Sequence, residues 1–237
     1  DLHGKVIDQV VAGAVTSHSK DWNLAREAVL STSLSPLTTG VTMQMACGTS
    51  LQAALMAGAQ IASGQIDCAI VGGTDTTSDA PIVFQRKFAQ RLIKLGRARS
   101  FGQKLGVFKG FSPAELTPQP PRNGEPRTGL SMGQHCERMA KAWSISRRDQ
   151  DELTLESHRK AAAAWDSGFF DDLVVSHNGV IRDNIVRPET SMEKLASLKP
   201  VFDRQDGSLT AGNSTTLTDG AAAVLLASEA WANAHDL

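Results

Sequence analysis

The 237-residue sequence has only three cysteines and no long apolar run. The cysteines, at positions 47, 68 and 136, are odd in number and widely spaced, which excludes a disulfide framework and a CxxC metal site. No apolar stretch approaches the roughly 20 residues that span a bilayer, and residues 1–5 do not begin a signal peptide. We therefore expect a soluble protein of a reducing compartment.

The sequence also lacks an excess of charge of either sign, with 24 basic and 25 acidic side chains. Nucleic-acid-binding proteins carry a basic surface, so this balance argues against a nucleic acid as the partner. Disorder is excluded as well, because 41% of the residues are apolar and a chain of this length can bury a sizeable core. One large domain or two small ones remain.

Strand and helix patterns alternate along the first third of the chain. Segments typical of strands occur at residues 5–13, 40–46 and 66–71, the last two apolar enough to be buried and the last ending at a glycine pair. Helical patterns lie between them, at residues 23–30 and 50–63. Strands separated by helices predict a parallel sheet, and hence the α/β class.

The remainder of the chain is divided by a proline-rich segment. Residues 112–129 hold five of the nine prolines and predict a loop or linker. Helical patterns follow at residues 131–143 and 146–168, the second opening with a capping box. Residues 171–198 are mostly irregular, and a small-residue core strand at 221–227 precedes a last short helix.

Cys47 is placed for chemistry, because it lies where a strand turns into a helix. The thiolate is the reactive form of cysteine, and the unpaired N–H groups of a helix N-terminus stabilise it. The small residues 48–50 let a carbonyl approach the backbone, and the N–H of Cys47 is placed to donate to an oxyanion. This pattern suits acyl transfer. The alternative is a cysteine that packs in a turn, and Cys68 is expected to be a core residue.

Neither the histidines nor the acidic residues indicate a second reactive centre. His135 and His158 fall on expected helices and have no further ligand at a metal-binding spacing, so we expect no metal site. Asp149, Asp151 and Glu152 crowd a helix N-terminus, which is the preference of the helix dipole.

Six segments, in this order, resemble landmarks of the thiolase family. They are MACGTSLQA at 45–53, GGTDTTS at 72–78, Met132-Gly133, SRRDQD at 146–151, LKPVFD at 198–203 and TAGNSTTLTDGAAA at 210–223. The resemblance covers about residues 6–230 and is nearest to the fatty-acid-oxidation β-subunit type. It implies an α/β thiolase-type core with a mostly parallel sheet between helices. Residues 1–78 and 206–237 would form the core, and residues 79–205 an inserted helical and irregular loop domain.

The resemblance implies an acetyl-CoA C-acyltransferase of fatty-acid β-oxidation or acetoacetyl-CoA metabolism, in which Cys47 takes the acyl group as a thioester. Its substrates would be coenzyme A (CoA) and acyl-CoA, with no permanently bound cofactor. It also implies a homo-oligomer, dimeric or tetrameric, in a bacterial cytoplasm or an organelle matrix. The implied CoA contacts are Met132 near the acyl sulfur, Arg187 at the adenine and phosphate end, Phe202 in the pantetheine tunnel, and Ala211, Gly212 and Thr215 along the pantetheine amides.

Family chains carry a GHP histidine and a CxGGG cysteine in a second half, and neither motif occurs in these 237 residues. We therefore expect the N-terminal core and loop domain, inactive by itself. Gln44, where the family usually has Asn, Ser or Thr, and TDTTS at 74–78, where ESMS is usual, leave the acyl chain length open. The alternatives are a β-ketoacyl carrier-protein synthase-like condensing enzyme and a non-catalytic assembly subunit.

Residues 80–114 contain eight basic side chains and no acidic one. Apolar residues recur among them at helical spacing, which predicts a basic amphipathic helix. Such a helix suits contact with an anionic membrane surface, a partner subunit or a polyanionic substrate. The thiolase resemblance implies, for residues 84–109, contact with a partner in a multienzyme β-oxidation complex or with a membrane surface. The alternative is a buried stripe with a solvated face. The basic residues are Arg86, Lys87, Arg91, Lys94, Arg97, Arg99, Lys104 and Lys109.

Overall fold

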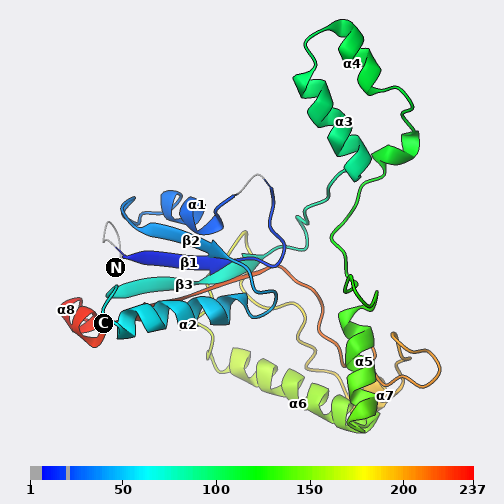
Figure 1. The fold of residues 1–237 in the computed structure, drawn as a ribbon. Helices are drawn as coiled ribbons and strands as arrows, with labels where there is room; N and C mark the ends of the chain where they lie inside the picture. The colour runs from blue at the N-terminus through cyan, green and yellow to red at the C-terminus, as the bar shows by residue number, and fades with distance from the viewer. Residues whose placement is uncertain (1–6, 20–21) are drawn as a thin grey trace. The chain divides into compact units, whose positions relative to one another are not determined.

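The computed structural model describes residues 7–19 and 22–237, which include a four-stranded sheet (Figure 1). In sheet order, the strands are β2 (Thr39–Met43), β1 (Gln9–Gly13), β3 (Cys68–Asp75) and β4 (Gly220–Ala227). Strand β1 pairs in parallel with β2 and β3, and β4 pairs antiparallel with β3. The prediction of a mostly parallel sheet is confirmed. Residues 5 and 6 of the first expected strand lie outside the described residues.

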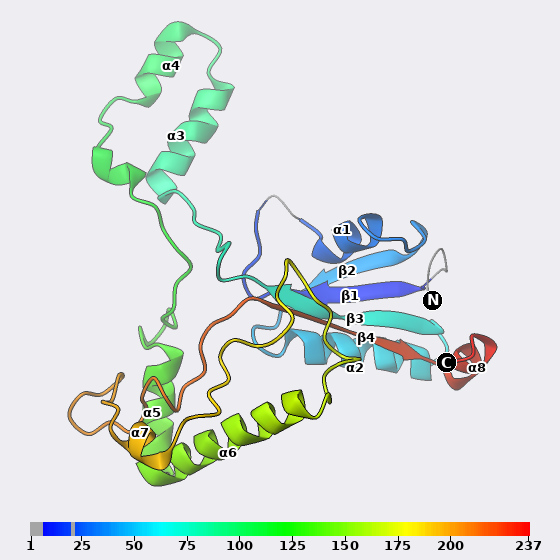
Figure 2. The same ribbon diagram turned by 180° about the vertical axis from the view of Figure 1, so that it is seen from behind.

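Two helices cover the two faces of this sheet, as Figures 1 and 2 show. Helix α1 (Leu24–Leu30) lies on one face and helix α2 (Thr49–Ala62) on the other. Successive side chains of a strand point to opposite faces, so Val10 packs in a cluster with residues of α1 and Val11 in a cluster with residues of α2. The expected layering, a sheet between helices, follows from this alternation.

Two strands are less buried than the sequence pattern predicts. Strand β2 is only half-buried and ends at Met43, so residues 44–46 belong to the turn before α2. Strand β4 is exposed from Gly220 to Val224. The expectation of buried strands at both places is wrong. Each strand lies at an edge of the sheet and has a neighbour on one side only.

The glycine pair that was expected to end the third strand lies inside β3 instead. Neighbouring backbones approach both glycines closely. A Cβ atom on Gly72 would collide with the carbonyl oxygen of Ala222, and one on Gly73 with that of Gly13. Glycine is therefore required here by the close approach of the flanking strands, and the strand continues to Asp75.

The chain divides into two compact units, Asp1–Pro121 with Leu217–Leu237 (unit 1) and Arg122–Thr216 (unit 2). Besides the sheet, unit 1 contains helices α3 (Arg86–Arg97), η1 (Pro113–Leu116), α4 (Phe101–Val107) and α8 (Glu229–Ala234). Unit 2 contains α5 (Met132–Ala142), α6 (Arg147–Asp166) and α7 (Met192–Ala196). Helices α5 and α6 both begin with a capping box, as expected for α6. The domain limits at residues 79 and 206 stay a prediction.

Apart from the single turn η1, the proline-rich residues 112–129 form no helix, as predicted. Within residues 7–19 and 22–237, no helix combines the length and the apolar character that crossing a membrane requires.

Candidate active site

Cys47 lies in the turn that joins β2 to α2. The turn is held by Thr49, whose hydroxyl accepts a hydrogen bond from the N–H of Met45 at 2.9 Å and donates one to the carbonyl of Ala46 at 2.7 Å. Ala46 has a φ of 46°, a left-handed conformation that costs a non-glycine residue energy and that often marks a functional site. This turn leaves Cys47 exposed, immediately before the N-cap residue Gly48 of α2.

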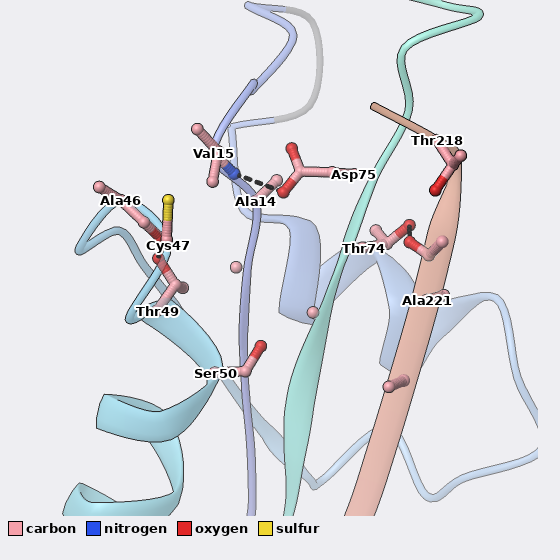
Figure 3. Close-up of a pocket in the computed structure, with 14 residues that line it drawn as sticks. Ala14, Val15, Ala46, Cys47, Thr49, Ser50, Thr74, Asp75, Thr218 and Ala221 are labelled. Carbon is pink, nitrogen blue, oxygen red and sulfur yellow. Dashed lines mark hydrogen bonds between the residues drawn. The ribbon is translucent and has the colours of Figure 1, made fainter. Parts of the chain in front are cut away.

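Cys47 opens onto a cavity of about 400 Å³ (Figure 3). Nearly all of the lining side chains are small, so a ligand can approach both the thiol and the backbone of the surrounding strands. The lining residues are Gly13, Ala14, Val15, Ala46, Cys47, Thr49, Ser50, Gly73, Thr74, Asp75, Thr218, Gly220, Ala221 and Ala222. All of them belong to unit 1.

The carboxylate of Asp75, at the end of β3, fixes the loop that follows β1. It accepts hydrogen bonds from the N–H groups of Val15 and Thr16, both at 2.9 Å, and from the Thr16 hydroxyl at 3.0 Å. Desolvation by burial raises the pKa of Asp75, but these hydrogen bonds outweigh it, so the pKa lies below its ordinary value of 3.8. Asp75 is therefore an ionised anchor for one wall of the cavity.

A second carboxylate, Asp219, fixes the loop that follows β3. It accepts hydrogen bonds from the N–H groups of Thr77 and Ser78, at 2.7 and 3.0 Å, and from both hydroxyls. The Ser78 hydroxyl, followed by the backbone donors, lowers the pKa of Asp219 to about 2. Because Asp219 directly precedes β4, it ties this loop to the strand that carries Gly220 and Ala221 of the cavity wall.

The other two cysteines are in different surroundings. Cys68 is 1% exposed in β3, which confirms it as a core residue. Burial raises the pKa of its thiol; a contact with the backbone of Asp8 lowers this pKa, and the negative charges of Asp8 and Asp67 raise it. Cys136 is partly buried on α5. Of the three thiols, that of Cys47 is the exposed one.

In unit 2, residues 210–213 form a braced turn, called the TAGN loop here. The buried Thr210 accepts hydrogen bonds at its hydroxyl from the N–H groups of Gly212 and Asn213. In return, the side-chain oxygen of Asn213 accepts the N–H of Thr210 at 2.7 Å. These local bonds fix the backbone on which the expected CoA contacts Ala211 and Gly212 lie.

Two buried carboxylates hold the TAGN loop from outside. Glu137 of α5, 3% exposed, accepts the N–H groups of Ser208 and Leu209, at 2.8 and 2.9 Å, and the Ser208 hydroxyl. Asp151 of α6, 1% exposed, pairs with Arg147 and accepts a hydrogen bond from the side chain of Asn213 at 3.0 Å. Asp151 thus lies near the N-terminus of α6, as expected, and it also binds a residue of a distant loop.

Asp75, Asp219 and Glu137 were not predicted from the sequence as residues that hold the site. Asp219 lies within the TAGNSTTLTDGAAA segment, so its motif was a usable signal. The position of Glu137 was also a signal, because this acidic residue lies on the same helix as Met132, which was expected to contact CoA. Nothing in the sequence shows that Asp75 reaches back 60 residues to the loop after β1.

Unit 2 contains all six residues expected to contact CoA. Met132 is exposed at the first turn of α5, next to Gly133, where a Cβ atom would collide with the half-buried ring of Phe202. Ala211 and Thr215 are exposed, and Gly212 is half-buried. The Phe202 ring thus lies against the residue that follows Met132, and the other three share one loop, whereas Cys47 belongs to unit 1.

Arg187, the sixth residue, is exposed and turned towards its own backbone. Its guanidinium donates to the carbonyl groups of Asn184 and Val186, and its N–H donates to Nδ1 of His158 at 3.2 Å. His158 therefore positions the Arg187 backbone. In the described part of the chain, no group of three or more His, Cys, Asp or Glu side chains is arranged to hold a metal ion.

In the basic segment, the guanidinium of Arg91 makes contacts within the protein. Its guanidinium pairs with Glu115 at 2.7 Å and donates to the carbonyl groups of Val107, Lys109 and Gly110. It therefore joins α3 to α4 and η1, and the expectation that it is one of the cations free for a partner is wrong. The alternative of a buried apolar stripe is also wrong, because α3 has no buried residue.

Comparison with known proteins places these features in a family. A family model described as "Thiolase, N-terminal domain" matches residues 1–230. The chain is 43% identical to a 3-ketoacyl-CoA thiolase of Shewanella baltica and 44% identical to one of Shewanella loihica, each over 99% of this chain and 55% of the relative. The chain thus spans about half the length of these curated relatives.

Solved structures show the same fold. The human mitochondrial 3-ketoacyl-CoA thiolase in complex with CoA matches 98% of this chain and 56% of its own, with a TM-score of 0.77 and 27% identity. The acetyl-CoA acetyltransferase of Bacillus anthracis matches all of this chain and 57% of its own, with a TM-score of 0.77 and 30% identity.

Proposed function

The chain belongs to the thiolase family, and from this premise we propose that its protein is an acetyl-CoA C-acyltransferase acting on 3-ketoacyl-CoA. The observation that carries the proposal is the exposed Cys47, held by a strained turn at the start of α2 and opening onto a cavity lined by small residues. The names of the relatives favour this function over a carrier-protein synthase or a non-catalytic assembly subunit.

In the proposed reaction, the thiolate of Cys47 attacks the 3-keto carbon of the substrate. The bond between C2 and C3 breaks, its electron pair stays on C2, and a general acid protonates C2 to release acetyl-CoA. The thiol of a second CoA then gives its proton to a general base and attacks the thioester on Cys47, which releases the shortened acyl-CoA and restores the thiolate. The N–H of Cys47 is proposed to donate to the oxyanion formed in each attack.

CoA is proposed to bind through unit 2. Met132 and Phe202 supply the apolar contacts for the acyl sulfur and the pantetheine arm, and Arg187 supplies a cation for the adenine and phosphate end. The TAGN loop and Thr215 supply donors along the pantetheine amides. The rigidity of this loop supports the assignment, because a loop fixed before binding loses less entropy when the ligand arrives.

The general acid and base are proposed to come from outside residues 1–237. His135 donates to or accepts from Thr128 at 3.2 Å, and His158 accepts from the Arg187 backbone, both within unit 2. The GHP histidine and the CxGGG cysteine that the thiolase resemblance implies for these two roles do not occur in residues 1–237. Residues 1–237 alone should therefore not turn over.

Two proposals concern partners. The protein is proposed to form a homo-oligomer, as the family resemblance implies. Residues 84–109, apart from Arg91, are proposed to contact a partner of a multienzyme complex or an anionic membrane surface. The exposure of Lys94 and Lys104 supports this second proposal, because both cations remain available to an anionic surface.

Cleavage of acetoacetyl-CoA, followed together with mass spectrometry of the Cys47 peptide, tests the proposed function. We expect turnover by the complete protein that contains residues 1–237, an acetyl adduct on Cys47, and no turnover by residues 1–237 alone. Cys47→Ala should lower the rate by about 10³-fold or more, whereas the control Cys136→Ala should leave it unchanged. Full activity of Cys47→Ala would refute the proposed nucleophile.

A further inference from the structure

The loop after β1 is fixed at both backbone atoms of one residue, Val15. Its N–H donates to the Asp75 carboxylate at 2.9 Å, and its carbonyl accepts a hydrogen bond from the Gln44 side chain at 3.3 Å. Asp75 lies at the end of β3, and Gln44 directly follows β2. Val15 is therefore held between the ends of the two strands that flank β1, and its backbone has little freedom to move.

The side chain of Val15 is the one branched aliphatic group among the described residues that line the Cys47 cavity. The other apolar lining residues are glycine, alanine and Cys47 itself. In Figure 3 the isopropyl group of Val15 points to the side of the cavity on which the Cys47 thiol lies. It is 43% exposed, so it stands at the cavity surface and is not part of the core.

We propose that Val15 determines which acyl groups Cys47 can accept, with Gln44 and Asp75 as the residues that position it. The proposal rests on the proposed function and adds a substrate class to it: acyl groups that are unbranched at the carbon next to the thioester carbonyl. A branched side chain held beside the thiol occupies the space that a methyl branch at this carbon would need. A linear chain can lead away from it.

A pair of isomeric substrates isolates this effect. 3-Oxohexanoyl-CoA leaves a butyryl group on Cys47, and 4-methyl-3-oxopentanoyl-CoA leaves an isobutyryl group with the same number of atoms. Because one methyl group misplaced in an apolar pocket changes kcat/KM by about 10-fold to 200-fold, we expect the complete protein to prefer the linear isomer by about 10-fold or more.

Variants of Val15 should move this preference in opposite directions. Val15→Ala should bring the linear-to-branched ratio of kcat/KM close to one, and Val15→Leu should raise it above that of the unmodified protein. The matched control is Val175→Ala, since Val175 is 88% exposed in unit 2 and does not line the cavity. It should leave the ratio unchanged.

Variants of the two positioning residues test the second part of the proposal. Gln44→Asn shortens the side chain by one methylene and withdraws its amide from the Val15 carbonyl. Asp75→Asn replaces one of the two acceptor oxygens. Both variants should lower the linear-to-branched ratio of kcat/KM, as Val15→Ala does. Asp75→Glu keeps the carboxylate, so its ratio should lie between that of Asp75→Asn and that of the unmodified protein. The rate of Cys47 acetylation, which transfers the smallest acyl group, should change by a smaller factor in these variants than the linear-to-branched ratio of kcat/KM does.

The ratios separate failure of the inference from failure of the proposed function. If the complete protein forms neither acyl adduct on Cys47, the proposed function is refuted, and the inference with it. If both adducts form but Val15→Ala and Val15→Leu leave the ratio within twofold of the unmodified protein, Cys47 acylation stands and the role of Val15 is refuted. An unchanged ratio in Gln44→Asn and Asp75→Asn would refute the positioning role alone.

Discussion

Glu137 is the residue whose replacement should most clearly reveal how the TAGN loop is held. Glu137→Gln keeps the shape of the side chain but replaces one acceptor oxygen by an amide N–H₂. Either the N–H of Leu209, or the N–H and the hydroxyl of Ser208, then face a donor instead of an acceptor. One buried unsatisfied donor costs about 1–3 kcal/mol, and the loss of charge from the remaining bonds adds about 1 kcal/mol.

The expected loss in the free energy of unfolding is therefore about 2–4 kcal/mol. Because 1 kcal/mol lowers Tm by about 2–4 °C for a protein of about 150–250 residues and by less for a longer one, the variant of the complete protein should melt several degrees lower. The KM for CoA should rise several-fold more than kcat falls, because the variant loosens a binding loop and leaves Cys47 untouched. Thermal unfolding and steady-state kinetics of the complete protein measure both.

Glu156→Gln is the matched control, since Glu156 is exposed on α6 and pairs only with Lys160 among the described residues. It should change neither Tm nor the KM for CoA. The pKa of Glu137 provides a second check. Burial raises it, but the hydrogen bonds from Leu209 and Ser208 outweigh burial, so it lies below the ordinary 4.5.

A depressed pKa means that the folded protein holds the Glu137 proton less tightly than the unfolded chain does. Its contribution to stability is therefore fully present above pH 4.5 and is lost as the pH falls through the lower, folded value. The Tm difference between the unmodified protein and Glu137→Gln should be constant above this pH and shrink below it. A Tm within 2 °C of the unmodified protein, together with an unchanged KM for CoA, would refute the reasoning.

Two other predictions follow from single contacts. The pKa of Asp219 is about 2 in the folded protein against an ordinary 3.8, so its contribution to stability is lost as the pH falls from 3.8 to about 2. In Asp219→Asn the free energy of unfolding should therefore fall less steeply with pH over this range. The exposed control Asp183→Asn should leave this pH dependence unchanged. Arg91→Ala should open residues 86–110 to limited proteolysis, whereas Lys94→Glu with Lys104→Glu should keep them resistant and instead abolish sedimentation with anionic vesicles at low salt. Unchanged proteolysis or sedimentation would count against the respective role.

The elements with clear local signals could be predicted from the sequence. The capping box at Ser146 and the apolar spacing after it define α6, and β-branched residues followed by a capped helix define β1 and α1. These signals are local, because a cap and its helix lie within a few residues. The alternation of Val10 and Val11 then follows from strand geometry alone.

Burial and strand ends could not be predicted, because they depend on what lies beside each strand. Strand β4 consists almost entirely of small apolar residues, which is typical of a core strand, yet its first half is exposed at the sheet edge. Gly72 and Gly73 have the composition of a turn, but their role comes from the carbonyl groups of Ala222 and Gly13. These neighbours are far away in the sequence.

For the candidate site, the sequence identified the nucleophile but not the residues that hold the surrounding loops. Cys47 could be found because its signal, a strand, small residues and a helix, is continuous along the chain. Val15 and Asp75 are 60 residues apart, and Glu137 and Leu209 are 72 apart. A hydrogen bond from a carboxylate to a distant backbone N–H leaves no periodic pattern, since the donor can belong to any residue type except proline.

Carboxylates suit this role better than cations or hydroxyls would. A loop without regular structure has backbone N–H groups that must find acceptors when they are removed from water. An ionised carboxylate offers two acceptor oxygens and makes charge-assisted bonds, so Asp75, Asp219 and Glu137 can each satisfy two adjacent N–H groups of one loop. The loops are therefore ordered by contacts inside their own units, before any ligand is present. A ligand that reaches Cys47 or the TAGN loop then meets a preformed surface, and its binding energy is not needed to organise it.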